Sequence, residues 1–170
     1  MIYIDQPVDT GFSYGHTLVT TMDEACEQFM NLMTNIWWWF PFDGVPLYMT
    51  GESYAGKYIP QFSWALLQNG NFNLQASLMG DPYTAPLIQR THMYLVPQAL
   101  NILDDSNMGQ IAALNRRCQE SLYSDMKAAN EICGNIMEYI EGVSGGVFFY
   151  DNRDFVYGWD PNEDIVTKYF

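Results

Sequence analysis

The sequence predicts an α/β fold, a parallel sheet with flanking helices, because short apolar runs alternate with longer segments of helical period. The strand candidates are residues 2–7, 46–50 and 74–80, and the helix candidates between them are residues 21–40 and about 55–67. Strands that alternate with helices in this order usually lie parallel in one sheet. At 170 residues, with 48% apolar and 16% aromatic residues, the chain is long enough to fill the core of one domain.

The first helix candidate has a start signal, an apolar face and a stop signal. Thr21 and Glu24 have the spacing of a capping box, and Pro41 stops the helix. The tryptophans at positions 37–39 are expected to pack in the core or against the sheet, and a ligand-stacking platform is the alternative. The apolar face consists of Phe29, Leu32, Met33, Ile36, Trp37 and Phe40.

The second helix candidate contains Pro60, which must lie near its start or kink it. Beyond the third strand the chain changes character, because the next apolar segments have helical period. The helix candidates there are residues 93–103, 106–123 and 125–141, followed by a strand candidate at 146–150.

These elements predict three parts of the chain. Residues 1–90 are expected to form the central part of the α/β core and residues 91–145 a helical cap or insertion. Residues 146–170 are expected to form an irregular tail, with a loop from Asp151 and a short helix from Asn162.

Charge and hydropathy limit the partners. Twenty acidic against seven basic side chains give a net charge of −13, whereas nucleic acid and anionic membranes bind basic patches, so neither is an expected partner. No apolar stretch approaches the roughly 20 residues that span a bilayer, which predicts a soluble protein. No basic leader follows Met1, so a secretory signal is not recognised and Met1 is expected to be an internal residue. The acidic excess suits an acidic compartment.

The three cysteines have no metal-ligand spacing, and neither a metal nor another cofactor is expected. An odd number leaves at least one of them unpaired within the chain. Cys26 falls near the apolar face of the first helix candidate and is expected to be a buried free thiol.

Ser53 is the candidate nucleophile because it lies where a strand is expected to turn sharply into a helix. Small residues at Gly51 and Ala55 bracket it and leave room for a tight turn that lifts the hydroxyl above the sheet edge. The following helix directs free N–H groups toward charge that develops beside the serine. The alternative is a glycine-punctuated turn with an idle serine.

Three segments of the chain resemble the serine carboxypeptidases, a family with the α/β-hydrolase fold. The resemblance implies a partial α/β-hydrolase fold in which residues 91–145 correspond to the inserted cap of the family. Asp9 departs from the small residue, usually glycine, that the family has at this position. The segments are Ile2-Tyr3-Ile4-Asp5-Gln6-Pro7-Val8 with Thr10-Gly11-Phe12-Ser13-Tyr14, then Thr50-Gly51-Glu52-Ser53-Tyr54-Ala55-Gly56-Lys57-Tyr58-Ile59-Pro60, and more loosely Gly80-Asp81-Pro82-Tyr83-Thr84.

The resemblance implies a role for each matching residue of the Ser53 turn. Ser53 would attack the scissile carbonyl and form an acyl-enzyme, and the backbone N–H of Tyr54 would be one oxyanion donor. Glu52, with its neighbour Gly51, would bind the terminal carboxylate of a peptide substrate. In this family that glutamate shares a proton with a second acidic side chain, which favours acidic pH.

The family also has parts that we do not find in this sequence. Its Asn-Gly-Gly-Pro-Gly loop and the aspartate and histidine of its catalytic triad are missing, so we expect an internal fragment that does not hydrolyse peptides alone and tends to aggregate. His92, although followed by methionine as in the family's histidine segment, lies at the start of a predicted cap helix. It and His16 are expected to be ordinary surface or core histidines, and Asp81 a turn former.

Three functions are left open by these residues. The leading hypothesis is a serine-type carboxypeptidase that releases C-terminal amino acids from peptides in a vacuolar, lysosomal or secreted location. The alternatives are a carboxypeptidase-like acyltransferase and a non-catalytic truncated homologue.

The resemblance places Cys118 and Cys133 in cap helices, where the family has disulfides. It implies that they pair with each other or with cysteines elsewhere. The oligomeric state is not indicated by the sequence.

Overall fold

The computed structural model of the protein describes residues 1–155, apart from the side chains of Met126 and Phe155. The chain divides into two compact units, Met1–Thr84 and Ala85–Phe170. Each unit has its own core of buried side chains and is described separately. The predicted short helix from Asn162 lies outside the described residues.

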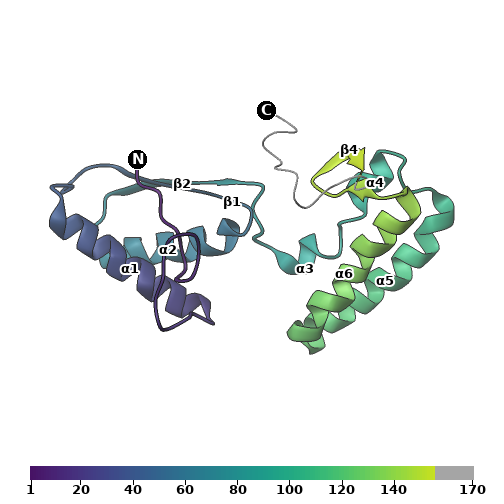
Figure 1. The fold of residues 1–170 in the computed structure, drawn as a ribbon, viewed down its shortest axis with the longest axis horizontal. Helices are drawn as coiled ribbons and strands as arrows, with labels where there is room; N and C mark the ends of the chain where they lie inside the picture. Colours follow the sequence, from purple (N-terminus) through teal and green to yellow (C-terminus); the bar gives the residue numbers. More distant parts are fainter. Residues whose placement is uncertain (156–170) are drawn as a thin grey trace. The chain divides into compact units, whose positions relative to one another are not determined.

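Unit 1 is built on a parallel pair of strands, β1 (Leu47–Glu52) and β2 (Leu74–Gly80), as the sequence predicts. Helix α2 (Ala55–Asn69) connects the two strands and packs on both of them, and helix α1 (Met22–Trp39) packs on α2 (Figure 1). The two strands pair in register from Tyr48 opposite Ala76 to the ends of both strands, where Glu52 lies opposite Gly80. The carboxyl ends of the strands therefore lie side by side.

The core of unit 1 lies where α1, α2 and the sheet meet. The rings of Phe29 and Phe62 stack at its centre, 4.2 Å apart between centroids and 7° from parallel. Apolar residues three or four positions apart share one helix face, which explains how α1 and α2 each contribute several side chains. The buried apolar residues are Ala25, Phe29, Met33, Met49, Ile59, Phe62, Leu66 and Phe72.

The prediction for the tryptophans is correct for one of the three. Trp37 packs edge-on against Phe72, with ring centroids 5.1 Å apart. Trp38 and Trp39 are instead 82% and 73% exposed. The buried stripe of α1 runs through positions 25, 29, 33 and 37, and consecutive residues of a helix are about 100° apart, so the next two positions point away from it.

The capping box of α1 is confirmed. The Thr21 hydroxyl accepts the backbone N–H of Glu24 at 3.2 Å, and the Glu24 carboxylate accepts the N–H groups of Thr20 and Thr21 at 2.7 and 3.0 Å. These hydrogen bonds lower the pKa of Glu24, with the Thr20 N–H the largest cause. The helix ends at Trp39, two residues before Pro41, as predicted.

Helix α2 accommodates Pro60 as its sixth residue. The proline ring is exposed, and only the backbone donor that would reach Gly56 is missing, so the helix continues to Asn69. Gly70 then ends it with φ of 76°, the left-handed conformation that glycine adopts without steric cost.

The strand expected at residues 2–7 is wrong. Within residues 1–155 the sheet of unit 1 has only β1 and β2, and neither pairs with this segment. A strand requires a neighbouring backbone for its N–H and C=O groups, which an apolar pattern alone does not supply. Of this segment, Ile4 still packs against the unit 1 core.

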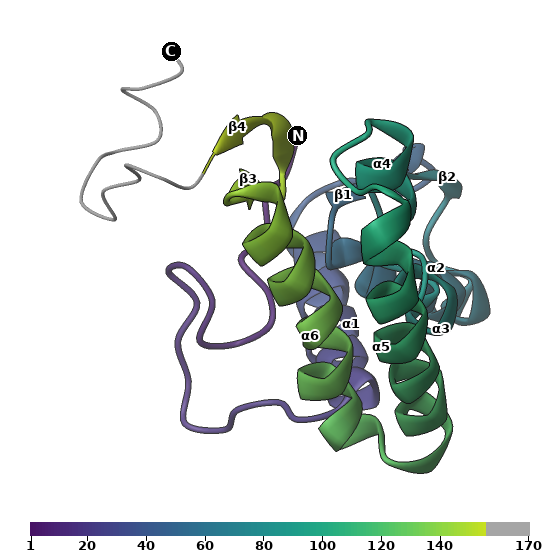
Figure 2. The ribbon, with the colours of Figure 1, turned by 90° about the vertical axis from the view of Figure 1, so that its right-hand side faces the viewer.

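In unit 2 the two long helices predicted from the sequence are confirmed. They are α5 (Asp105–Ser124) and α6 (Met126–Ser144), which pack against each other along their length (Figure 2). Asp104 caps α5 and Asp125 caps α6, each carboxylate accepting two backbone N–H groups. The core between them contains Leu103, Ile111, Leu114, Cys118, Leu122, Ala129, Cys133, Ile136, Ile140 and Val147.

A disulfide joins Cys118 to Cys133, which settles the pairing that the sequence left open. Both half-cystines are fully buried between α5 and α6. Cys26 is a free thiol, as predicted, but only half-buried. Burial, with the nearby charge of Asp23 as a smaller cause, raises its pKa.

Two further predictions for unit 2 are wrong. The helix expected at 93–103 is reduced to α4 (Leu95–Ala99), because Asn101 has φ of 57°, which no helix continues through; a shorter α3 (Pro86–Gln89) precedes it. The tail expected to be a loop from Asp151 begins with a strand. β3 (Val147–Phe148) and β4 (Asp151–Phe155) form an antiparallel hairpin, in which Arg153 and Asp151 pair at 2.7 Å.

Candidate active site

Ser53 lies in the tight turn predicted between β1 and α2. The strand ends at Glu52 and the helix begins at Ala55, so two residues make the whole connection. Ser53 has φ of 54° and is exposed. Residues other than glycine, asparagine and aspartate are uncommon in this left-handed region, because their backbone is strained there. Backbone strain of this kind concentrates at functional sites.

Three backbone hydrogen bonds hold Ser53 in this conformation. Its N–H donates to the Gly80 carbonyl at 3.0 Å. Its own carbonyl accepts the N–H of Gly56 at 3.0 Å and the N–H of Tyr83 at 2.9 Å. The turn is thus fixed from α2 on one side and from the segment after β2 on the other.

Two glycines allow this close approach. A Cβ on Gly51 would lie 2.5 Å from the Cβ of Ala55, and a Cβ on Gly56 would lie 2.6 Å from the backbone nitrogen of Tyr83. Both distances are shorter than any ordinary contact between such atoms, so a larger residue would displace the turn or its neighbours. The small residues of the motif are therefore required by sterics.

Tyr54 follows the serine and begins α2 as its N-cap, with φ of −62°. Within residues 1–155 its backbone N–H donates to no acceptor. Its ring, about half exposed, contacts those of Tyr58 and Tyr83, with centroids 5.2 and 6.3 Å away. The ammonium of Lys57 lies 5.5 Å from the centroid of the Tyr83 ring.

Glu52 is the last residue of β1, and its side chain is exposed next to the end of β2. In the part of the chain that the structure describes, its carboxylate makes no hydrogen bond or ion pair. Gly80 lies opposite it, where even a Cβ would be 3.6 Å from the Glu52 side chain. The glutamate is therefore accessible to a ligand directly beside the serine.

Both histidines are expected to be ordinary surface or core residues, and the structure shows both of them exposed. His92 is exposed, and its Nδ1 lies 2.7 Å from the carbonyl of Ile88 and 3.0 Å from the hydroxyl of Thr91. His16 is exposed in a loop. Within unit 1, residues 1–84, no side chain accepts a hydrogen bond from the Ser53 hydroxyl. Asp81 lies in the bend after β2 with φ of 38°, consistent with its predicted place in a turn.

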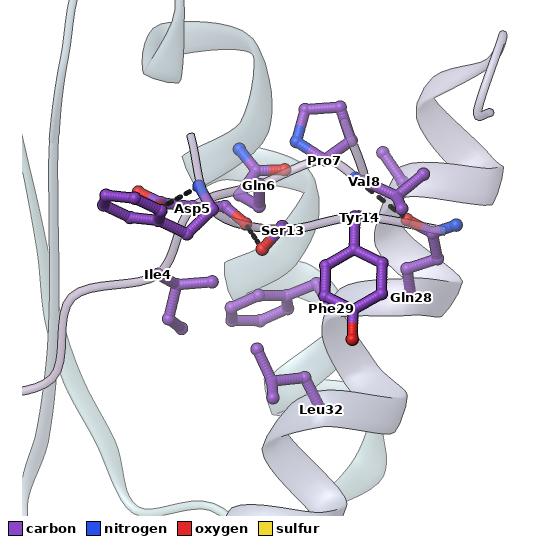
Figure 3. Close-up of a pocket in the computed structure, with 12 residues that line it drawn as sticks. Ile4, Asp5, Gln6, Pro7, Val8, Ser13, Tyr14, Gln28, Phe29 and Leu32 are labelled. Atoms are coloured by element: carbon purple, nitrogen blue, oxygen red, sulfur yellow. Dashed lines mark hydrogen bonds between the residues drawn. The ribbon is translucent and has the colours of Figure 1, made fainter. Parts of the chain in front are cut away.

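A separate pocket of about 410 Å³ lies between the loop at residues 4–14 and α1 (Figure 3). Asp5 organises the loop, because its carboxylate accepts the N–H of Phe12 at 2.9 Å and its carbonyl accepts the hydroxyl of Ser13 at 2.6 Å. The Oε1 atom of Gln6 is buried there without a partner in the described residues. No residue of the Ser53 turn lines the pocket. Its lining includes Ile4, Asp5, Gln6, Pro7, Val8, Phe12, Ser13, Tyr14, Ala25, Gln28, Phe29 and Leu32.

The same loop explains the residue at which the sequence departs from the family pattern. Asp9 has φ of 74°, a conformation in which glycine is free of strain and aspartate is tolerated. Its N–H still donates to the Ser13 carbonyl, at 2.9 Å. Gly11 cannot vary in this way, since it has φ of 56° and a Cβ there would collide with the Asp5 carboxylate.

Comparison with protein families identifies the chain, because the family described as serine carboxypeptidase matches residues 1–164. The chain belongs to the serine carboxypeptidase family. It is 31% identical over 180 aligned positions to serine carboxypeptidase S10 family member 1 of Dictyostelium discoideum, covering 99% of this chain and 42% of that protein. It is 35% identical to carboxypeptidase Y homolog A of Uncinocarpus reesii, covering 81% of this chain and 28% of that one.

A solved carboxypeptidase structure shows the same fold. KEX1(DELTA)P, a prohormone-processing carboxypeptidase from Saccharomyces cerevisiae, matches with a TM-score of 0.72 and 26% identity, over 84% of this chain and 35% of that one. The chain thus contains part of the α/β-hydrolase fold, as predicted. It spans less than half the length of these relatives.

Residues 1–155 contain neither a membrane-spanning helix nor a cluster of metal ligands. No helix there is both long enough and apolar enough to cross a bilayer. No group of three or more histidine, cysteine, aspartate or glutamate side chains in the same residues is arranged to hold a metal ion.

Two residues of this site are not singled out by sequence reasoning. The sequence indicates Gly56 only as part of a motif, whereas the structure shows why no larger residue fits. The sequence gives Tyr83 no role, although its N–H and its ring both reach the turn. The sequence includes it only in the segment from Gly80 to Thr84 that loosely resembles the family, and its position three residues after the end of β2 has no meaning until the strand pairing is known.

Proposed function

We propose that Ser53 is the nucleophile of a serine-type carboxypeptidase, which releases C-terminal amino acids from peptides. The observation that supports this most directly is the exposed serine at φ of 54° in a two-residue connection between a parallel strand and a helix. A serine held in this way presents its hydroxyl to a substrate with little backbone rearrangement.

In the proposed reaction the Ser53 hydroxyl attacks the last peptide carbonyl of the substrate and gives up its proton to a general base. The N–H of Tyr54, which has no acceptor in the described residues, hydrogen-bonds the oxyanion that forms. The C-terminal amino acid leaves with a proton on its new amine, and water then hydrolyses the acyl-enzyme. Unit 1 places no base at the hydroxyl, and the family's triad aspartate and histidine are not found in the sequence, so these 170 residues alone are proposed to be inactive.

Glu52 and Gly51 are proposed to bind the terminal carboxylate of the peptide. Glu52 is exposed directly before the nucleophile and has no partner in the described residues. A protonated carboxyl can donate a hydrogen bond to a carboxylate, whereas an ionised one repels it. An acidic pH is therefore proposed to favour binding of the substrate.

Residues 91–145 are proposed to act as a cap, with the long pair α5 and α6 as its rigid part. The buried disulfide between Cys118 and Cys133 indicates an oxidising compartment. Together with the net charge of −13, this supports a vacuolar, lysosomal or secreted location. No cofactor and no nucleic-acid partner are proposed.

The test is labelling of the full-length protein with a fluorophosphonate, which reacts with activated serines. Wild type and Ser124→Ala, a matched change at an exposed helix serine, should be labelled equally, and Ser53→Ala should not be labelled. When the full-length protein is incubated with an N-blocked dipeptide at acidic pH, chromatography should show release of the C-terminal amino acid. Labelling that persists in Ser53→Ala would overturn the assignment.

The same incubation distinguishes the alternative activities. A product ester formed with an added alcohol, in place of free acid, would identify an acyltransferase. Absence of labelling in the wild type at every pH would favour a non-catalytic homologue.

A further inference from the structure

We propose that Tyr83 is a positioning residue for the oxyanion donor, acting on the peptide unit between Ser53 and Tyr54. This inference rests on the proposed function, because it concerns how the Tyr54 N–H is aimed. Tyr83 contacts that part of the turn in two ways, through its backbone and through its ring.

The backbone contact fixes a plane. The Ser53 carbonyl and the Tyr54 N–H belong to one planar peptide group, in which they point in opposite directions. The N–H groups of Tyr83 and Gly56 both donate to the carbonyl end, at 2.9 and 3.0 Å. Holding the carbonyl therefore also sets the direction of the N–H, which points away from both donors toward the site where an oxyanion would form.

The contact between the Tyr83 and Tyr54 rings holds Tyr54, the residue whose N–H is the oxyanion donor. The rings of Tyr83 and Tyr54 are stacked, 28° from parallel and 6.3 Å apart between centroids, while the Tyr58 ring meets that of Tyr54 edge-on at 5.2 Å. The separations fall within the range in which aromatic pairs attract each other. Lys57, 5.5 Å from the Tyr83 ring centroid, adds a cation contact that links Tyr83 to the first turn of α2.

The steric limit at Gly56 shows how closely the two segments fit. A Cβ at this position would lie 2.6 Å from the Tyr83 nitrogen and 2.8 Å from the Cβ of Pro82. A methyl group at Gly56 must therefore push the segment after β2 away from the turn. This lengthens the hydrogen bond from the Tyr83 N–H to the Ser53 carbonyl, without altering Ser53 or Tyr54 chemically.

The experiment measures kcat and KM for an N-blocked dipeptide in the full-length protein. Tyr83→Ala should lower kcat by about fivefold to tenfold with little change in KM, because an aromatic contact that aligns the donor affects the transition state and not the ground state. Tyr83→Phe keeps the ring and the backbone N–H and should restore most of the rate. Gly56→Ala should lower kcat by up to about 100-fold, the loss expected when one oxyanion donor is misplaced.

A double-mutant cycle separates positioning from general damage. In a Tyr54→Ala background the ring contact is already absent, so Tyr83→Ala should then change kcat by less than about twofold. Gly109→Ala is the matched control for Gly56→Ala, since it adds the same methyl group to a helix where nothing lies within 4 Å. It should leave kcat unchanged.

A second readout does not depend on turnover. A peptide aldehyde that adds to Ser53 should bind Tyr83→Ala more weakly by the same factor as kcat falls, whereas a product peptide should bind equally well. Equal losses from Tyr83→Ala in both Tyr54 backgrounds, or a change in KM alone, would overturn the inference. Fluorophosphonate labelling that does not depend on Ser53 would instead overturn the proposed function, which distinguishes the two failures.

Discussion

Replacing Ser53 by glycine should relieve backbone strain while abolishing the reactivity of the site. Ser53 has φ of 54°, and the left-handed conformation costs a residue with a Cβ about 1–2 kcal/mol. The greater freedom of glycine in the unfolded chain offsets about 0.4–1 kcal/mol of this gain. We therefore expect Ser53→Gly to be roughly 0.5–1 kcal/mol more stable than Ser53→Ala, from the difference between these two effects.

The alanine variant is the matched control, because both variants lose the hydroxyl and only glycine loses the Cβ. The assay is urea denaturation monitored by circular dichroism. The m-value, the slope of the free energy of unfolding against urea concentration, has to be the same for both variants. Gly70 gives an independent measure of the same backbone strain, because here the substitution adds a Cβ at positive φ instead of removing one. It has φ of 76°, and nothing lies within 4 Å of the position that a Cβ would take, so Gly70→Ala should lose a similar free energy of unfolding. A glycine variant of Ser53 no more stable than the alanine variant, alongside a destabilised Gly70→Ala, would refute the strain argument.

Three further changes test other parts of the chain. Replacing both Cys118 and Cys133 by alanine should lower the free energy of unfolding by about 3 kcal/mol, since the disulfide spans 15 residues. A loss of less than about 1 kcal/mol in urea denaturation would contradict this expectation. The pKa of Glu24 is lowered in the folded state, so its stabilising effect should be present above its usual pKa of 4.5 and lost as pH falls through the lower folded value; melting curves of Glu24→Gln should lack that dependence. Gly11→Ala should lower the melting temperature, because the new methyl group meets the Asp5 carboxylate at a positive φ, and an unchanged temperature would argue against this loop geometry.

The elements that could be predicted from the sequence are those with local signals. The capping box at Thr21 and Glu24 and the stop at Pro41 bound α1 within one or two residues. The strand at 74–80 and the helix pair α5 and α6 also follow from pattern alone. In each case the residues that specify the element are inside it or directly beside it.

The errors concern features that depend on distant residues. Residues 2–7 have a strand pattern, but no described strand pairs with them. Trp38 and Trp39 are as apolar as Trp37, and only the packing of α1 on α2 determines which of them is buried. The same holds for Tyr83, whose contact with the Ser53 turn requires β1 and β2 to pair in parallel with their carboxyl ends side by side.

The Ser53 turn differs from the rest of the proposed catalytic apparatus in how it is specified. Its conformation depends on Gly51, Gly56, Gly80 and Tyr83, which lie in β1, in α2, at the end of β2 and in the segment just after β2, all within unit 1. The sterically strained part of the site is therefore built from one β-α-β segment and the residues just after it. Proton transfer requires a base, and unit 1 places none at the Ser53 hydroxyl. Geometry and reactivity are thus separable in this protein, so a variant can keep the turn intact and still be inactive.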